Sequence, residues 1–177
     1  MKRIIDDINT FKGNILCIGV DNEKILSNLK KNNTIGLFEL NRGSSNKIFG
    51  KRKINDNNGK SIPIKKFRKV FKKKSLDYII INLNSVYDYQ KYIASNVVYL
   101  CKKKVYIYGT SDIINSSYVA RKYKRYNTKI ECIDDSNNYC VIVDCSCAKY
   151  NWFKEKFYII IDSFINLGDM ITYFLTS

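Results

Sequence analysis

The residues best placed to do chemistry stand where apolar runs end: Gly19, Glu39, Asn82 and Gly109. The run ILCIGV, residues 15–20, indicates a strand buried on both faces, and DNEKILSNLKK after it indicates an amphipathic helix. Gly19 therefore lies at a strand-to-helix turn, where a glycine lets a ligand approach the backbone. Such turns hold a nucleotide cofactor in many proteins, so cofactor binding is the first chemistry to consider.

Two acids after Gly19 restrict which cofactor the turn can hold. A pyrophosphate binds at a helix N-terminus because backbone N–H groups and the helix dipole favour negative charge. Asp21 and Glu23 would each repel it by on the order of 1 to 4 kcal/mol, and the spacing GxGxxG is missing. NAD, FAD and nucleoside triphosphates are therefore poor candidates. A simpler interpretation is that both acids cap the helix 22–31 and complement its dipole.

Groups of catalytic or metal-binding residues are scarce. The sequence has no histidine, which excludes a Cys/His zinc site, and its six cysteines lack the paired spacing of a four-cysteine site. We therefore expect no metal. A general base would have to be Asp, Glu, Lys, Tyr or Cys, and no group of them stands out. Cys17, Cys132, Cys140 and Cys145 fall in predicted buried strands, where a thiol behaves as a small apolar side chain.

A strongly basic segment spans residues 47–74, with Asp56 as its single acid. A helix beginning at Pro63 would bury Phe67 and Phe71 and turn its lysines outward together. We call Lys65, Lys66, Lys69 and Lys73 the lysine face. Such a face can bind the phosphates of nucleic acid or anionic lipid head groups. The alternative is an ordinary solvated helix face.

Strands and helices alternate along the chain, which predicts a parallel sheet with helices on both faces. The fold class is therefore α/β, a doubly wound and mostly parallel sheet closed by an antiparallel hairpin. Ligands of such sheets bind outside the carboxyl ends of the strands. Residues 43–61 form a loop or a weak strand pair. The expected strands are 14–20, 34–40, 76–82, 104–108, 128–134 and 139–145, and the expected helices are 3–11, 22–31, one from Pro63, 87–101, 111–126 and 151–175.

The order of elements, above all the final helix followed by a hairpin, resembles the class I S-adenosylmethionine-dependent methyltransferase fold, a Rossmann-like fold, over residues 1 to about 147. The family's first motif is an acid followed by glycines at alternate positions. These positions fall on Cys17, Gly19, Asp21 and Glu23, so only Gly19 matches. The family's ribose-binding acid falls on Glu39, and its motif after the fourth strand falls on NLNS, where only Asn82 matches.

The resemblance implies S-adenosylmethionine as cofactor, with Gly19, Asp21 and Glu39 as binding residues and Asn82 as the candidate catalytic residue. This cofactor has no phosphate and carries a sulfonium cation, so carboxylates near it are tolerated. The missing glycines favour a degenerate site that binds it weakly or not at all. The alternative is an active methyltransferase acting on nucleic acid or protein. For Glu39 the plain alternative is a solvated acid at a strand end.

Residues 148–177 extend beyond the methyltransferase-like domain, residues 1–147. Apolar residues recur there at spacings of four and three, and we call them the apolar seam: Phe153, Phe157, Ile160, Phe164, Leu167, Ile171 and Phe174. Asp162 and Asp169 disfavour a membrane span, since each costs roughly 3 kcal/mol near the bilayer centre. The C-terminal helix is expected to pack on the domain or to form a homodimer or protein contact, and association with a membrane surface stays open.

The net charge is +15, from 31 lysines and arginines against 16 acids. Such a charge favours polyanionic partners such as nucleic acid, although a composition rich in Lys, Asn, Ile and Tyr accounts for part of it. Residues 1–13 mix charged and apolar side chains and do not resemble a signal peptide. Together with the unpaired cysteines, this predicts a cytoplasmic location.

Overall fold

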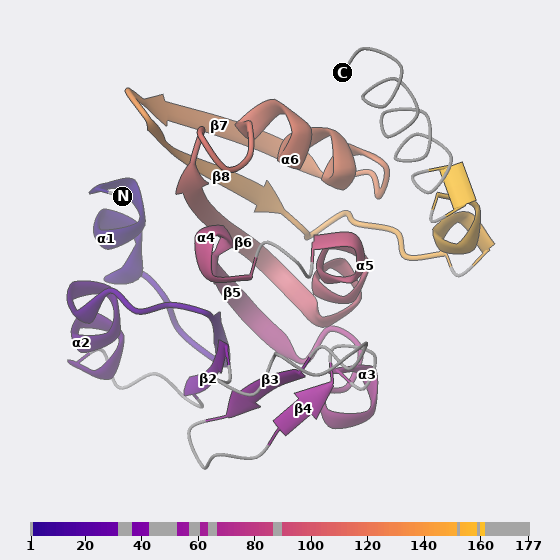
Figure 1. Cartoon of the computed structure of the whole chain (residues 1–177). Helices are drawn as coiled ribbons and strands as arrows, with labels where there is room; N and C mark the ends of the chain where they lie inside the picture. The colour runs from indigo at the N-terminus through magenta and orange to yellow at the C-terminus, as the bar shows by residue number, and fades with distance from the viewer. Residues whose placement is uncertain are drawn as a thin grey trace.

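The computed structural model describes residues 2–31, 37–42, 53–56, 61–63, 67–86, 90–151, 153–158 and 160–161. Within them one mixed sheet carries its strands in the order β4-β3-β2-β1-β5-β6-β8-β7 (Figure 1). The predicted α/β class is confirmed at this level. The strands are β1 (Ile15–Ile18), β2 (Leu37–Arg42), β3 (Lys53–Asp56), β4 (Ser61–Pro63), β5 (Leu76–Asn82), β6 (Cys101–Thr110), β7 (Lys129–Asp135) and β8 (Asn138–Asp144). The helices are α1 (Lys2–Ile8), α2 (Glu23–Lys31), α3 (Phe67–Val70), α4 (Leu83–Val86), α5 (Gln90–Leu100) and α6 (Ser116–Lys124).

Four strands form the parallel centre of the sheet. β1 pairs in parallel with β2 and with β5, and β5 pairs in parallel with β6. Every residue of β1 is buried, as is the carboxyl half of β5. Strands covered on both faces need apolar side chains pointing both ways, which explains the continuous apolar runs in the sequence. The predicted parallel arrangement of these four strands is confirmed.

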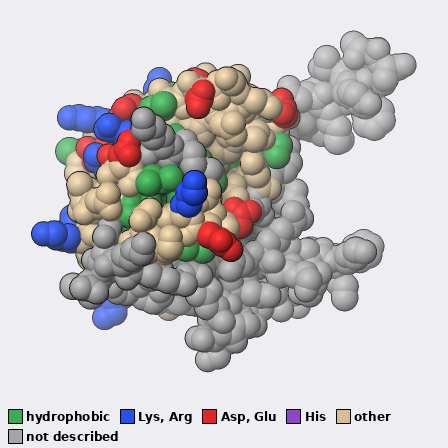
Figure 2. All heavy atoms as spheres, turned by 90° about the vertical axis from the view of Figure 1, so that its left-hand side faces the viewer, with side chains coloured by type: hydrophobic (Ala, Val, Ile, Leu, Met, Phe, Trp, Pro, Cys, Tyr) green, Lys and Arg blue, Asp and Glu red, His purple; other side chains and the backbone are tan. Residues whose placement is uncertain are grey.

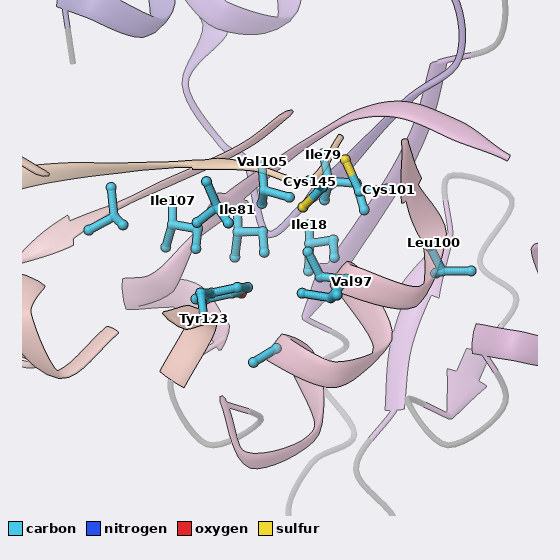
Figure 3. Close-up of a cluster of buried hydrophobic side chains, with 14 of the residues drawn as sticks. Ile18, Ile79, Ile81, Val97, Leu100, Cys101, Val105, Ile107, Tyr123 and Cys145 are labelled. Atoms are coloured by element: carbon cyan, nitrogen blue, oxygen red, sulfur yellow. The ribbon is translucent and has the colours of Figure 1, made fainter. Parts of the chain in front are cut away.

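Two hydrophobic clusters hold the helices against the sheet, one on each face. The first contains Ile18, Ile81 and Ile107 from the strands together with Val97 of α5 and Tyr123 of α6 (Figure 3). The second joins the sheet to α1 and α2, and its members include Ile4, Ile8, Ile25, Leu29, Ile80 and Tyr106. Neighbouring residues of β5 enter different clusters because successive side chains of a strand point to opposite faces.

The closing hairpin is present as predicted. β8 lies between β6 and β7 and pairs antiparallel with both, so β7 is the edge strand of the described sheet. This position corrects one prediction, because Cys132 on β7 is exposed and not buried. An edge strand has a neighbour on one side only, and most of β7 is exposed.

The helix predicted from Pro63 was wrong in its start. Pro63 ends β4 and pairs with Lys53 of β3, while α3 begins at Phe67. β4 is the other edge of the sheet, where a residue without an N–H is tolerated because one side of the strand has no partner. β3 and β4 form the strand pair that the sequence left as the alternative to a loop.

The helix predicted over 111–126 also begins later than expected. It starts at Ser116, and its N-cap is Asn115, whose Oδ1 accepts the N–H of Ser117 at 2.8 Å. The backbone N–H of Ser111 donates to the carbonyl of Asn137 at 2.8 Å. Ser111 therefore belongs to a turn that is held by the loop between β7 and β8.

The chain after the hairpin is tied to the domain through Arg68 of α3. Its guanidinium donates to both carboxylate oxygens of Glu155, at 2.8 and 3.2 Å, and to the hydroxyl of Tyr150. The guanidinium carbon also lies 4.9 Å from the ring centre of Tyr99 and 4.4 Å from that of Tyr150. This contact joins segments 87 residues apart in the sequence.

The apolar seam is described only in its first part, where residues 153–158 and 160–161 are helical. Phe153, Phe157 and Ile160 are 76%, 61% and 54% exposed. The remaining seam residues lie outside the described residues. Among the helices that are described, none has the length and apolar character needed to cross a membrane.

Candidate cofactor site

The turn after β1 has the strand–turn–helix form that the sequence predicts. Gly19 is buried and has a φ of +63°, a left-handed conformation in which glycine avoids strain. Asn22 caps α2, because its Oδ1 accepts the N–H groups of Lys24 and Ile25 at 3.1 and 3.2 Å. The simpler interpretation of the two acids is therefore wrong about the cap, although Glu23 does lie in the first turn, where its charge complements the dipole.

Asp21 has a different role, since it joins the turn to the end of β5. The side-chain amide of Asn82 donates to Asp21 Oδ1 at 3.0 Å. Asn82 is only 5% exposed, and its side-chain oxygen, Oδ1, accepts the backbone N–H of Asn84 at 3.2 Å. The structure thus brings together two of the predicted site residues, 61 positions apart. Both polar ends of the Asn82 amide are engaged by the protein.

A second link joins the ends of β5 and β6. Asn84 Oδ1 accepts the backbone N–H of Thr110 at 3.0 Å. A Cβ on Gly109 would lie 3.1 Å from this same oxygen and 2.8 Å from the hydroxyl of Tyr139. A side chain at position 109 would therefore have to displace the end of the Tyr139 or the Asn84 side chain. Sequence reasoning passed over Asn84, although it stands in the same NLNS segment as Asn82.

Two tyrosine hydroxyls near these links are buried and have no hydrogen-bond partner among the described residues: those of Tyr108 and Tyr139. Burial raises the pKa of Tyr108, and the charges of Asp21 and Cys17 raise it further. Burial raises the pKa of Tyr139 to about 12, with a smaller effect from Asp134. Both hydroxyls therefore keep their protons at neutral pH, and each can donate a hydrogen bond. In the sequence they could not be distinguished from core aromatics.

The prediction that Glu39 stands at the end of its strand is wrong. β2 runs on to Arg42, and Glu39 pairs in register with Cys17 in the middle of β1. Pairing with β3 accounts for the extension, since Leu40 to Arg42 form its ladder with that strand. The side chain of Glu39 lies outside the described residues.

A cavity of about 330 Å³ lies at the opposite end of the sheet, by the amino ends of β5 and β6. Arg3, Asp7, Tyr78, Lys103 and Tyr106 line it. The hydroxyl of Tyr106 donates to Asp7 at 2.9 Å, and Asp7 also pairs with Arg3 at 3.5 Å. This cavity is therefore separate from the Gly19 turn. Within the described residues no cluster of three or more Cys, Asp or Glu side chains could hold a metal ion.

The lysine face is described in part. Lys69 and Lys73 are exposed, and Lys65 and Lys66 lie outside the described residues. Lys74 differs from them, because its Nζ donates to the carbonyls of Cys101 and Cys145 at 2.8 and 3.0 Å. On the side of the molecule that carries α1 and α2, basic and acidic side chains lie interspersed (Figure 2).

No protein-family model matches the sequence, and no curated protein matches it. Three solved structures are similar in fold. A Thermus thermophilus 16S rRNA N2 G1207 methyltransferase, in complex with AdoMet and guanosine, has a TM-score of 0.46 at 8% identity, covering 84% of this chain and 40% of that one. A release factor-specific protein-(glutamine-N5) methyltransferase from Alicyclobacillus acidocaldarius has a TM-score of 0.47 at 9% identity, covering 81% and 90%. A Pyrococcus furiosus methyltransferase has a TM-score of 0.36 at 12% identity, covering 81% of each chain.

At these identities and TM-scores the three likenesses carry no argument about the fold or the activity of this chain. The chain spans about 40% of the length of the first of the three proteins. The parallel centre of the sheet and its closing hairpin are the features on which the resemblance was based. The described residues therefore have the α/β arrangement that the resemblance predicted.

Proposed function

We propose that this chain is a doubly wound methyltransferase-like domain with an added C-terminal helix and a degenerate cofactor site. It binds S-adenosylmethionine weakly or not at all, and its lysine face binds a polyanion such as nucleic acid. The observation that carries the proposal is the 3.0 Å hydrogen bond between Asn82 and Asp21. It fixes a carboxylate in the turn at a position where the family has a bare glycine.

This bond weakens cofactor binding for a local reason. A ligand that approached the Gly19 turn would meet the side chains of Asp21 and Glu23 in place of backbone N–H groups. Moving Asp21 aside would break its bond to Asn82. A hydrogen bond to a charged group contributes about 1.5 to 3 kcal/mol, and the exposure of Asp21 places this one at the lower end.

The lysine face is supported by the way α3 is anchored. Phe67 in α3 is fully buried and Phe71, just after the helix, nearly so, while Lys69 of α3 and Lys73 in the turn that follows are exposed. Both aromatics are committed to the core and cannot stack on bases. Binding therefore rests on phosphate contacts and shows no sequence preference.

Calorimetric titration with S-adenosylmethionine tests the cofactor site. The wild-type chain should give little or no heat, and Asp21→Gly combined with Glu23→Gly should raise the affinity at least tenfold. Asp21→Asn is the matched control, because it removes the charge but keeps the side chain, and it should gain much less. Tight binding by the wild type, lost on Glu39→Ala, would contradict degeneracy and favour the alternative function.

Neutralising the lysine face tests the partner. Replacing its members with glutamine should abolish binding to RNA and heparin while leaving the melting temperature nearly unchanged. The matched control replaces exposed lysines elsewhere, with the same loss of charge: Lys12, Lys24, Lys102 and Lys154. Equal losses in the two variants would mean that net charge alone attracts the polyanion. An unchanged affinity of the lysine-face variant would mean that these lysines are only solvated and bind no partner.

The alternative function is an active methyltransferase acting on nucleic acid or protein. The hydroxyls of Tyr108 and Tyr139, which have no partner in the described part of the chain, favour it, because a bound ligand could satisfy buried donors of this kind. Transfer of a labelled methyl group from S-adenosylmethionine to cellular RNA or protein would support it. Tyr108→Phe and Tyr139→Phe should then each reduce the transfer, whereas on the degenerate proposal no transfer occurs.

The exposed start of the apolar seam supports a further role in protein contact. Phe153, Phe157 and Ile160 present apolar side chains to solvent on a helix that Glu155 anchors to α3. We propose that this surface binds a protein partner. Phe157→Asp should abolish capture of that partner without lowering the melting temperature, since the Phe157 side chain is mostly exposed.

A further inference from the structure

The outer edge of β7 has no pairing partner among the described residues. β7 pairs with β8 on one side, and no described strand lies on the other. Its seven residues, Lys129–Asp135, are mostly exposed, with Ile130 and Ile133 half-buried. The open edge of a strand presents free N–H and C=O groups on which a further strand can pair.

The sequence of β7 is complementary to itself when two copies run antiparallel. With the two-fold axis at Cys132, Lys129 stands opposite Asp135 of a second copy, and Asp135 stands opposite its Lys129. Asp134 then faces Ile130, Glu131 faces Ile133, and Cys132 faces Cys132. Directly opposed residues in an antiparallel pair have Cβ atoms about 4.5 to 5.5 Å apart, close enough for the two Lys–Asp pairs to attract.

Other registers match less of the strand or oppose like charges. Directly opposed residues of an antiparallel pair point to the same face of the sheet. A two-fold axis perpendicular to the sheet must therefore pass between two copies of the same residue. An axis at Glu131 or at Asp134 places two identical acids opposite each other. An axis at Ile133 places Glu131 opposite Asp135. An axis at Ile130 also places Lys129 opposite Glu131, but it pairs only residues 129–131 of β7 and leaves residues 132–135 without a partner in the strand.

We propose that the protein forms a homodimer by antiparallel pairing of two β7 edges around Cys132. The contact is isologous, as two-fold dimers require, and it continues the sheet from one copy into the next. β7 ends the strand order, whereas β1 and the Gly19 turn lie near its middle. Dimerisation therefore leaves the candidate cofactor site uncovered. A single strand pair buries less than the roughly 1,200 Å² of a standard interface, so the dimer is weak, in the micromolar range.

A charge swap tests the register. Sedimentation velocity of the wild-type chain should show a monomer–dimer equilibrium at micromolar concentrations. Lys129→Asp or Asp135→Lys alone should weaken the dimer about tenfold, because each creates two like-charge pairs. The double variant, Lys129→Asp with Asp135→Lys, should restore it. A monomeric wild type, or a dimer that is indifferent to all three variants, would overturn the proposal.

Thiol crosslinking provides an independent measurement. Cys132 and Cys147 are the two exposed cysteines, and the other four are buried. A short bismaleimide should link dimers of the Cys147→Ser variant and not those of Cys132→Ser. The reverse result would refute pairing around Cys132. A dimer lost on Phe157→Asp but insensitive to the charge swap would form through the apolar seam and would refute it as well.

Discussion

Replacing Glu155 with glutamine should destabilise the protein by about 2 kcal/mol at neutral pH. Breaking one partner of a fully buried ion pair costs about 3 to 5 kcal/mol, and an exposed pair contributes about 0 to 1 kcal/mol. The side chains of Arg68 and Glu155 are 25% and 10% exposed, between these limits. Glutamine keeps the shape of the side chain and removes its charge, so the guanidinium beside Tyr99 and Tyr150 loses its counterion. For a domain of this size the melting temperature should fall by about 4 to 8 °C.

The pH dependence of this effect has a definite sign. Burial tends to raise the pKa of Glu155, but hydrogen bonds from Arg68, Ser95 and Tyr150 outweigh it and hold the pKa below its usual value. A carboxyl whose pKa is lower in the folded state stabilises the fold above its unfolded pKa, about 4.3. That stabilisation is lost as the pH falls through the folded value. The difference between the wild type and Glu155→Gln should therefore be full near pH 7 and shrink below about pH 4.

Urea denaturation across this pH range is the measurement, with Asp6→Asn as the control. Asp6 is exposed on α1, so its replacement should change the free energy of unfolding by less than about 0.5 kcal/mol. Equal stability of the wild type and Glu155→Gln at neutral pH would refute the energetic argument. A difference that persists undiminished below pH 3 would show that packing, and not charge, is responsible.

Three further outcomes are expected. Gly109→Ala should lower stability by about 1 to 3 kcal/mol in thermal melts, because its methyl group would overlap the Tyr139 hydroxyl; adding Tyr139→Phe should recover part of the loss, and no recovery would mean that the contact with Asn84 dominates. NAD and ATP should leave the melting curve unchanged at millimolar concentration, and tight binding of either at the Gly19 turn would refute the electrostatic argument against phosphate. If the lysine face binds nucleic acid, its neutralisation should reduce the slope of log affinity against log salt by about 3, whereas an unchanged slope would place the phosphate contacts elsewhere.

The sequence predicts the centre of the fold well because the relevant signals are local and strong. Continuous apolar runs such as 15–20 and 78–81 are typical of strands buried on both faces, and the structure has strands there. The hairpin of β7 and β8 follows in the same way from two short strands around a polar turn. Burial on β7 was predicted less well, because an edge position depends on the order of strands, and Cys132 is exposed as a result.

Element starts and polar links depend on contacts that no local pattern contains. Ser111 is as good an N-cap type as Asn115, but the loop carrying Asn137 takes up its N–H. A proline such as Pro63 is compatible both with the start of a helix and with an edge strand. Here the pairing of β4 with β3 makes it part of a strand. The ion pair between Arg68 and Glu155 joins distant segments and could not be predicted from either of them.

On the proposed function, the fold has persisted although its cofactor-binding turn has changed. The hydrophobic clusters that hold the sheet draw on strand interiors such as Ile79, Ile80 and Ile81, and the turn residues lie beyond them. Asp21 can replace a glycine there without disturbing either cluster, and its bond to Asn82 adds a link between β1 and β5. A turn held by its own side chains no longer needs a ligand to order it. On the proposed function, the stability of the domain should therefore be independent of S-adenosylmethionine, whereas Asn82→Ala should lower it by about 1 to 2 kcal/mol.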